Sequence, residues 1–300
     1  MFYTPILFLI FNRPEVTQKV FEEIKKQKPK YLFVAADGPR PNFEEDKEKC
    51  KKCRDIVLKG IDWDCEVKTL FRDENLGCGR GVSSAINWFF ENVEQGIILE
   101  DDCLPHPSFF MYCETLLNKY KDHENIYVIS GSNFQNGIQR GDASYYFSNY
   151  GFVWGWASWR RAWVNYDFNL GKLYEFQKNN LISKIDDRKK FNDYWNANFE
   201  KVKGKQIDTW DYQWLFALWN NNGIAAISNE NLISNIGFGN DATHTIKHSP
   251  LANIPTKDIN SLRHPRKIKI NKEADKYASK FVFEIPFEEN YLIRKLKSLF

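Results

Sequence analysis

GIILEDDCLPHP, residues 96–107, is the stretch of sequence that decides the fold of this chain. Its apolar part has the character of a buried strand and stops at three consecutive carboxylates, Glu100, Asp101 and Asp102. A buried strand that ends in acids places them at the carboxyl edge of a sheet, where open α/β sheets bind their ligands. Because clustered carboxylates repel one another, they indicate either a bound cation or a solvated acidic turn.

The chain before this stretch alternates between strand and helix patterns. We expect strands over residues 6–11, 31–36 and 65–71, and helices over residues 16–26, 44–59 and 82–92. Strands that alternate with helices favour a mostly parallel sheet with right-handed crossovers. The loops after the strands then meet at one edge, so the α/β reading brings Arg13, Asp37 and Arg80 to the same edge as the three acids.

The second half of the chain has a different texture. An aromatic run, YYFSNYGFVWGWASWRRAW, fills residues 145–163, and DTWDYQWLFALW, residues 208–219, has an acidic start typical of a helix. A charged helix is expected over residues 184–205, and a glycine-rich polar loop over residues 236–245. We therefore divide the chain into residues 1–137, residues 138–255 of the same domain, and a C-terminal extension, residues 256–300.

Composition excludes several classes of protein. The formal net charge is only +3 over 300 residues, which does not indicate a nucleic-acid partner. The six cysteines form no dense framework, and one CxxC at residues 50–53 has no second pair, so we expect reduced thiols and no zinc site. No apolar run is long enough for a transmembrane helix, and no secretion-signal pattern is present, so we expect a cytoplasmic location.

Residues 97–137, IILEDDCLPHPSFFMYCETLLNKYKDHENIYVISGSNFQNG, carry a family resemblance. The block is similar to the GT-A-type glycosyltransferases, and more narrowly it resembles the N-acetylglucosaminyltransferase I and protein O-mannose N-acetylglucosaminyltransferase family. ILFLIFNR, VAADG, SNYGFVWGWASWRRAW and TWDYQW resemble further segments of that family, and the likeness covers roughly residues 4–245. It implies a GT-A fold, with a Rossmann-like, mostly parallel central sheet flanked by helices and an aromatic-rich acceptor half.

The resemblance implies roles for the residues of the nucleotide-sugar-binding half, residues 1–137. Asp102 would bind Mn²⁺ or Mg²⁺, while Asp101 and Glu100 would hold water or the ribose. Arg13 and Asp37 would contact the base and ribose of the nucleotide. From the residues themselves, the glycine-rich loop that contains Arg80 supplies backbone N–H groups that suit an anion or a ribose. Structural alternatives for this half are an ordinary Asp-Gly turn at Asp37 and an exposed arginine at Arg80.

The resemblance also implies roles in the acceptor-binding half, residues 138–255. Asp211, which lies between two tryptophans, would be the catalytic base, with Asp208 as the second candidate. The structural alternative is a helix N-cap at Asp208 and a first-turn acid at Asp211. His244 is a candidate for a second metal ligand. Three tryptophans are candidates for contact with the substrate, with packing in a core as the alternative: Trp154, Trp156 and Trp210.

Together these features predict a metal-dependent inverting glycosyltransferase. It would move a sugar, with N-acetylglucosamine as one candidate, from a UDP-sugar to a saccharide or glycolipid acceptor. A nucleotidyltransferase is one alternative, although the loop FNRP, residues 11–14, lacks the glycines that a triphosphate loop needs. A non-catalytic carbohydrate-binding protein is the other. The basic amphipathic pattern of residues 291–300 indicates a peripheral membrane contact or a solvated helix face.

Overall fold

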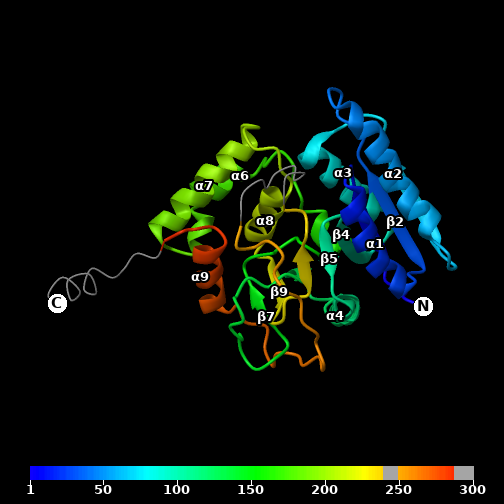
Figure 1. Cartoon of the computed structure of the whole chain (residues 1–300). Helices are drawn as coiled ribbons and strands as arrows, with labels where there is room; N and C mark the ends of the chain where they lie inside the picture. Colours follow the sequence, from blue (N-terminus) through cyan, green and yellow to red (C-terminus); the bar gives the residue numbers. More distant parts are fainter. Residues whose placement is uncertain (239–248, 287–300) are drawn as a thin grey trace, which may run out of the picture.

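The computed structural model describes residues 1–238 and 249–286, and a central eight-stranded sheet runs through it (Figure 1). The strands lie side by side in the order β3 (Glu66–Phe71), β2 (Tyr31–Ala36), β1 (Ile6–Ile10), β4 (Gln95–Glu100), β8 (Trp156–Trp159), β6 (Ile126–Ser130), β9 (Ile224–Ser228) and β7 (Tyr145–Ser148). Only β8 and β7 pair antiparallel with their neighbours; the other pairs are parallel. The mostly parallel sheet and the α/β class expected from the sequence are therefore confirmed.

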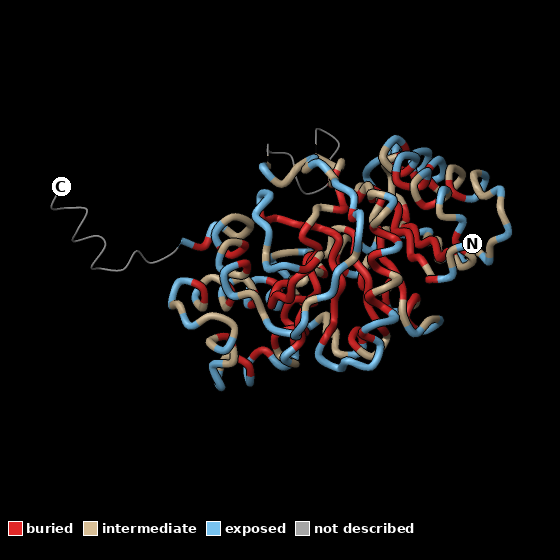
Figure 2. The backbone as a smooth tube through the Cα atoms, turned by 90° about the horizontal axis from the view of Figure 1, so that it is seen from below, coloured by how far each residue is buried: buried red, intermediate tan, exposed pale blue. Residues whose placement is uncertain are grey.

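Helices cover both faces of this sheet. One face carries α1 (Pro14–Gln27), α2 (Glu44–Gly60) and α4 (Pro107–Lys119). The other carries α3 (Gly77–Asn92), α5 (Arg160–Trp163), α6 (Leu173–Lys178), α7 (Lys189–Lys203), α8 (Asp211–Asn220) and α9 (Lys272–Phe281). Successive strand residues alternate between the two resulting cores: Phe8 packs in the first and Leu7 in the second. Figure 2 shows the buried backbone concentrated in the centre, with exposed loops around it.

The turn after β4 lies between the sheet and a small ribbon. β5 (Cys103–Pro105) follows the turn and pairs antiparallel with β10 (Ile233–Asn235). The Ile236 N–H donates to the Asp102 carbonyl at 2.8 Å, which continues this pairing into the acidic turn. The three acids therefore leave the sheet at its carboxyl edge but remain packed against a second layer of backbone.

The two halves of the chain share the sheet. β8, from residues 138–255, lies between β4 and β6, which both belong to residues 1–137. Because each of these strands needs its neighbour for backbone hydrogen bonds, the first half has no complete sheet of its own.

Two helices begin five residues away from the start that the sequence predicts. The helix expected over residues 82–92 begins at Gly77, so the glycine-rich segment is its first turn rather than a loop. The charged helix expected over residues 184–205 begins only at Lys189, and a separate 3₁₀ turn, Leu181–Lys184, precedes it. The break coincides with Asp186, whose carboxylate accepts the backbone N–H of Arg188 and pairs with its guanidinium.

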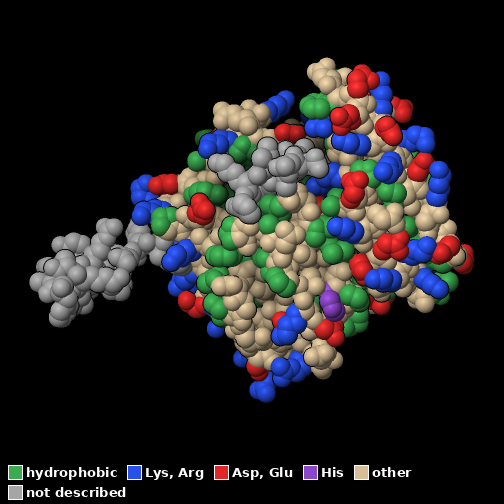
Figure 3. All heavy atoms as spheres, in the orientation of Figure 1, with side chains coloured by type: hydrophobic (Ala, Val, Ile, Leu, Met, Phe, Trp, Pro, Cys, Tyr) green, Lys and Arg blue, Asp and Glu red, His purple; other side chains and the backbone are tan. Residues whose placement is uncertain are grey.

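The surface matches the weak net charge. Figure 3 shows Lys and Arg side chains intermingled with Asp and Glu over the side of the molecule that carries α1 and α2. Among residues 1–238 and 249–286, no helix is both long and apolar enough to span a bilayer. The amphipathic pattern of residues 291–300 and the candidate ligand His244 lie outside the described residues.

Candidate active site

A cavity of about 420 Å³ opens at the carboxyl ends of β1, β2, β3 and β4. Its volume is within the range of small-molecule sites, roughly 300–1,000 Å³. The loops after these strands supply one part of its lining, and the segment that precedes α8 supplies another. The sequence-predicted residues that line it are Arg13, Asp37, Glu100, Asp101, Asp102, Trp154, Asp208, Trp210 and Asp211.

Arg13 is the counter-ion of the acidic turn. Its Nη2 pairs with Asp101, and its Nη1 donates to Asp102 Oδ2 at 3.0 Å. Asp101 also accepts the backbone N–H of Phe11 at 3.3 Å, which ties the end of β1 to the end of β4. The resemblance implies that Arg13 contacts the nucleotide. The structure shows that Arg13 also forms ion pairs with two neighbouring carboxylates.

Even with Arg13 beside them, Glu100 and Asp101 resist ionisation. Burial, followed by the charges of Asp102 and Asp101, raises the pKa of Glu100 to about 8. Burial also raises the pKa of Asp101, and Arg13 offsets this only in part. A site whose acids resist ionisation in this way favours the arrival of a further cation.

The donor set suits a partly hydrated divalent metal. Within the described residues, no three Cys, His, Asp or Glu side chains are gathered closely enough to enclose a metal ion by themselves. Mg²⁺ keeps several waters and needs only one or two carboxylates plus phosphate oxygens. Asp102 is the more accessible of the two acids that Arg13 contacts, with 16% of its side chain exposed against 4% for Asp101. The acidic turn thus offers the kind of donor that Mg²⁺ or Mn²⁺ accepts, and Asp102 is the more accessible of the two acids paired with Arg13.

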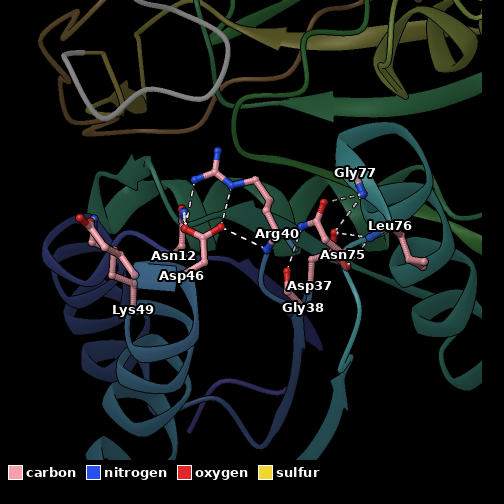
Figure 4. A network of polar contacts seen from close by, with 10 residues as sticks. Asn12, Asp37, Gly38, Arg40, Asp46, Lys49, Asn75, Leu76 and Gly77 are labelled. Carbon is pink, nitrogen blue, oxygen red and sulfur yellow. Dashed lines mark hydrogen bonds and ion pairs between the residues drawn. The ribbon is translucent and has the colours of Figure 1, made fainter. Parts of the chain in front are cut away.

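Asp37 faces the start of α3. Its carboxylate accepts the backbone N–H of Leu76 at 3.0 Å and that of Gly77 at 3.2 Å, as Figure 4 shows. Burial raises the pKa of Asp37, and these hydrogen bonds offset only part of the effect. The anion that the glycine-rich segment binds here is one of the chain's own carboxylates.

Asp208 contacts the same helix from the other half of the chain. Its Oδ1 accepts the Gly79 N–H at 3.1 Å. A Cβ at Gly77 would lie 2.7 Å from the Asp208 carboxylate, and one at Gly79 would lie 2.5 Å from it. These glycines therefore provide space for an acid that comes from 129 residues away in the sequence.

Asp211 begins α8 and lines two cavities. It accepts a hydrogen bond from the Thr209 hydroxyl, within its own segment. Beside the main cavity it also lines a smaller one of about 120 Å³, whose walls include Phe152, Trp195 and Tyr212. Asp211 is thus a carboxylate shared by the acid-lined cavity and an aromatic one.

The three predicted tryptophans differ in their surroundings. Trp154 is partly exposed, lines both cavities and contacts the ring of Phe134. Trp210 lines the main cavity although only 3% of its surface is exposed. Trp156 has no exposed surface and packs against Trp210 and Trp214. A fully buried ring cannot touch a substrate, so the predicted contact of Trp156 is replaced by a role in the core.

Arg80 does not line the cavity. It lies in the first turns of α3, is exposed, and holds its guanidinium 4.9 Å from the centre of the Phe168 ring. The sequence predicted an open loop here, with the Arg80 side chain in the site. Because the helix begins at Gly77, the side chain lies outside the cavity.

Two arginines of the cavity were not among the predicted residues. Arg40 follows β2, and its Nε and Nη2 donate to the buried Asp46 at 2.6 and 3.0 Å (Figure 4). Asn12 donates to the same carboxylate at 2.8 Å. Arg72 follows β3 and donates to Ser84 at 2.8 Å. Both arginines lie in the loops that follow predicted strands, and this was the available signal, since such loops share the edge that carries the acids.

Comparisons with known proteins give remote likenesses. No protein-family model and no curated protein matches the chain. A cytidylyltransferase from Leptospira borgpetersenii is 15% identical, with a TM-score of 0.34 over 56% of this chain and 64% of that one. A UDP-glucose pyrophosphorylase complexed with UDP-glucose is 10% identical, with a TM-score of 0.31 over 54% of this chain and 78% of that one. Mouse xyloside xylosyltransferase 1 is 11% identical, with a TM-score of 0.34 over 74% of this chain and 82% of that one. At these values the likenesses assign neither a family nor an activity to the chain.

Proposed function

We propose that this chain is a metal-dependent inverting glycosyltransferase that uses a UDP-sugar donor. The observation that carries the proposal is a single cavity lined both by the acidic turn after β4 and by Asp211 at the start of α8. The first set suits a cation and a diphosphate, and the second supplies a carboxylate for an acceptor hydroxyl. N-acetylglucosamine is the first donor sugar to test, and a saccharide or lipid-linked saccharide is the proposed acceptor.

The donor side would be organised by Asp102 and Arg13. A divalent cation, when bound, would neutralise the charge that develops on a diphosphate leaving group. Asp102 would hold it, and Glu100 and Asp101, which line the cavity beside it, would hold water or the ribose. Arg13, which already lies at this turn, would add a guanidinium able to bind phosphate oxygens.

The acceptor side would be organised by Asp211. An inverting transfer needs a base that takes the proton of the acceptor hydroxyl, and such bases typically contribute about 10²–10⁴-fold to the rate. Asp211 lines both the main cavity and the aromatic one, so an acceptor in the latter could present a hydroxyl to it. Trp154, which lines both cavities too, offers a ring face on which a sugar can pack.

The test is a panel of UDP-, GDP- and CMP-sugars with Mn²⁺ or Mg²⁺, read as nucleotide release. We expect release of UDP that chelation abolishes, and a loss of about 100-fold or more in Asp102→Asn, because electrostatic stabilisation of this kind is worth several kcal/mol. Asp142→Asn, which removes an exposed carboxylate, is the matched control and should keep wild-type turnover. Full metal-dependent turnover in Asp102→Asn would refute the proposal.

The same preparation separates the alternatives. Pyrophosphate release from a nucleoside triphosphate and a sugar 1-phosphate, without turnover of any nucleotide sugar, would indicate a nucleotidyltransferase. Calorimetry with UDP and Mn²⁺ tests the other alternative, a protein without catalytic activity. Saccharide binding without UDP binding would indicate a non-catalytic carbohydrate-binding protein.

A further inference from the structure

The start of α3 is capped by residues distant in the sequence. Leu76 occupies the N-cap position and has no side-chain acceptor for the first-turn N–H groups. Gly79 is buried, and a buried backbone N–H at a helix start needs an acceptor. Asp208 supplies it at 3.1 Å, while Asp37 accepts the N–H groups of Leu76 and Gly77. Two carboxylates at the positive end of a helix are also electrostatically favourable.

The contact at Gly79 fixes the segment that precedes α8. Besides the Asp208 carboxylate, the carbonyl of Thr209 lies 2.9 Å from where a Cβ of Gly79 would be, so the backbone of this segment packs on the first turn of α3. The Thr209 hydroxyl in turn donates to Asp211, and the Thr209 carbonyl accepts from Gln213 Nε2 at 2.7 Å. A continuous set of contacts thus runs from α3 to Asp211.

We infer that Asp208 is a positioning residue: it anchors the Asp208–Asp211 segment to α3 and so holds Asp211 at the cavity. This inference rests on the proposed function, in which Asp211 is the base. It also separates the roles of the two acids. Asp211 would take the proton of the acceptor hydroxyl, and Asp208 would act only through its hydrogen bond to Gly79.

The substitution Asp208→Asn distinguishes a positioning residue from a base. An asparagine side-chain oxygen still accepts the Gly79 N–H, but an amide cannot take up a proton at neutral pH. We expect Asp208→Asn to keep kcat within about fivefold of wild type, the effect of weakening one hydrogen bond. Asp208→Ala should lower kcat by about 10- to 100-fold, because a small misplacement of a catalytic group is costly. The donor KM should stay unchanged in both, and Asp211→Asn should lose about 100-fold or more.

Two results would overturn the inference. If Asp208→Asn were as inactive as Asp211→Asn, Asp208 would itself be the base. If Asp208→Ala kept the wild-type kcat, the anchor would have no role in positioning.

Hydrogen exchange gives a readout that does not depend on turnover. We expect Asp208→Ala to speed amide exchange at Gly79 and also across residues 209–214, while Asp208→Asn keeps wild-type protection at both. If the wild type turned over no nucleotide sugar, the proposed function would fail, and this paired change would still support the anchor. An unchanged exchange rate at residues 209–214 in Asp208→Ala would contradict it.

Discussion

At the scale of the residue, Arg13 explains how three adjacent acids are tolerated. Its guanidinium forms ion pairs with Asp101 and Asp102, and all three of these side chains are mostly buried. The resemblance implies a nucleotide contact for Arg13, but the sequence alone does not show which carboxylates a distant arginine will meet. In the sequence, Arg13 is 88 positions from Asp101 and 89 positions from Asp102.

Removal of this arginine tests its role as counter-ion. We expect Arg13→Ala to lower the free energy of unfolding by about 3–5 kcal/mol, because it leaves buried carboxylates without their partner. Millimolar Mn²⁺ or Mg²⁺ should restore part of the loss by binding the folded state. Urea titration measures both effects, with Arg80→Ala, an exposed arginine, as the control. Equal losses in the two variants would contradict the prediction.

Trp154 and Trp156 differ in burial: Trp154 is partly exposed, and Trp156 is fully buried. Trp156→Ala should lower the free energy of unfolding by about 3–5 kcal/mol, since it empties a space in the core. Trp154→Ala should cost clearly less, because that ring is partly exposed at the cavity. Urea titration of the two variants decides the point. A similar cost for both would show that Trp154 is also a core residue.

At the scale of the element, α3 shows how distant side chains move a helix boundary. Glycines are poor helix formers, so residues 77–81 looked like a loop. Asp37 and Asp208 satisfy the first N–H groups and occupy the space that side chains would fill, which lets the helix begin at Gly77. The glycine spacing was visible in the sequence, but the acids that require it were not.

Helix α9 is joined to β7 through one carboxylate. Asp275 accepts hydrogen bonds from the Ser148 hydroxyl at 2.6 Å and from the Asn149 backbone N–H at 3.1 Å. Burial nevertheless raises its pKa from 3.8 to about 6. The folded state therefore resists ionisation of this residue more than the unfolded chain does.

Burial of Asp275 makes the stability of the folded state depend on pH. Below the pKa of the unfolded state, Asp275 is protonated in both the folded and the unfolded state, so it does not affect the free energy of unfolding. Above the pKa of the folded state, Asp275 is ionised in both states, and burial of its charge destabilises the folded state. The difference in unfolding free energy between wild type and Asp275→Asn should thus shift against wild type by about 2 kcal/mol between pH 4 and pH 7. Urea titrations of both proteins across this range measure the shift, and parallel curves would contradict it.

At the scale of the whole molecule, strand order makes the chain one folding unit. β8 lies between β4 and β6. Residues 1–137 therefore contain both β4 and β6 but not the strand that connects them in the sheet. Eight of the ten tryptophans lie after residue 137, so their fluorescence reports mainly on the second half. We expect urea unfolding followed by fluorescence and by far-ultraviolet circular dichroism to show one shared midpoint. Two separate midpoints would show that the halves unfold independently.

The sequence by itself determined the α/β class, the strands that carry the first four loops, and the acidic turn at the end of β4, because these follow from the period and polarity of neighbouring residues. The tertiary structure alone decided that Arg13 pairs with two of the acids, that Asp208 contacts Gly79, and that Trp156 is buried. The physical reason is that such contacts depend on packing between segments separated by tens of residues or more. A local pattern indicates which chemical groups are present, and the fold decides which of them meet.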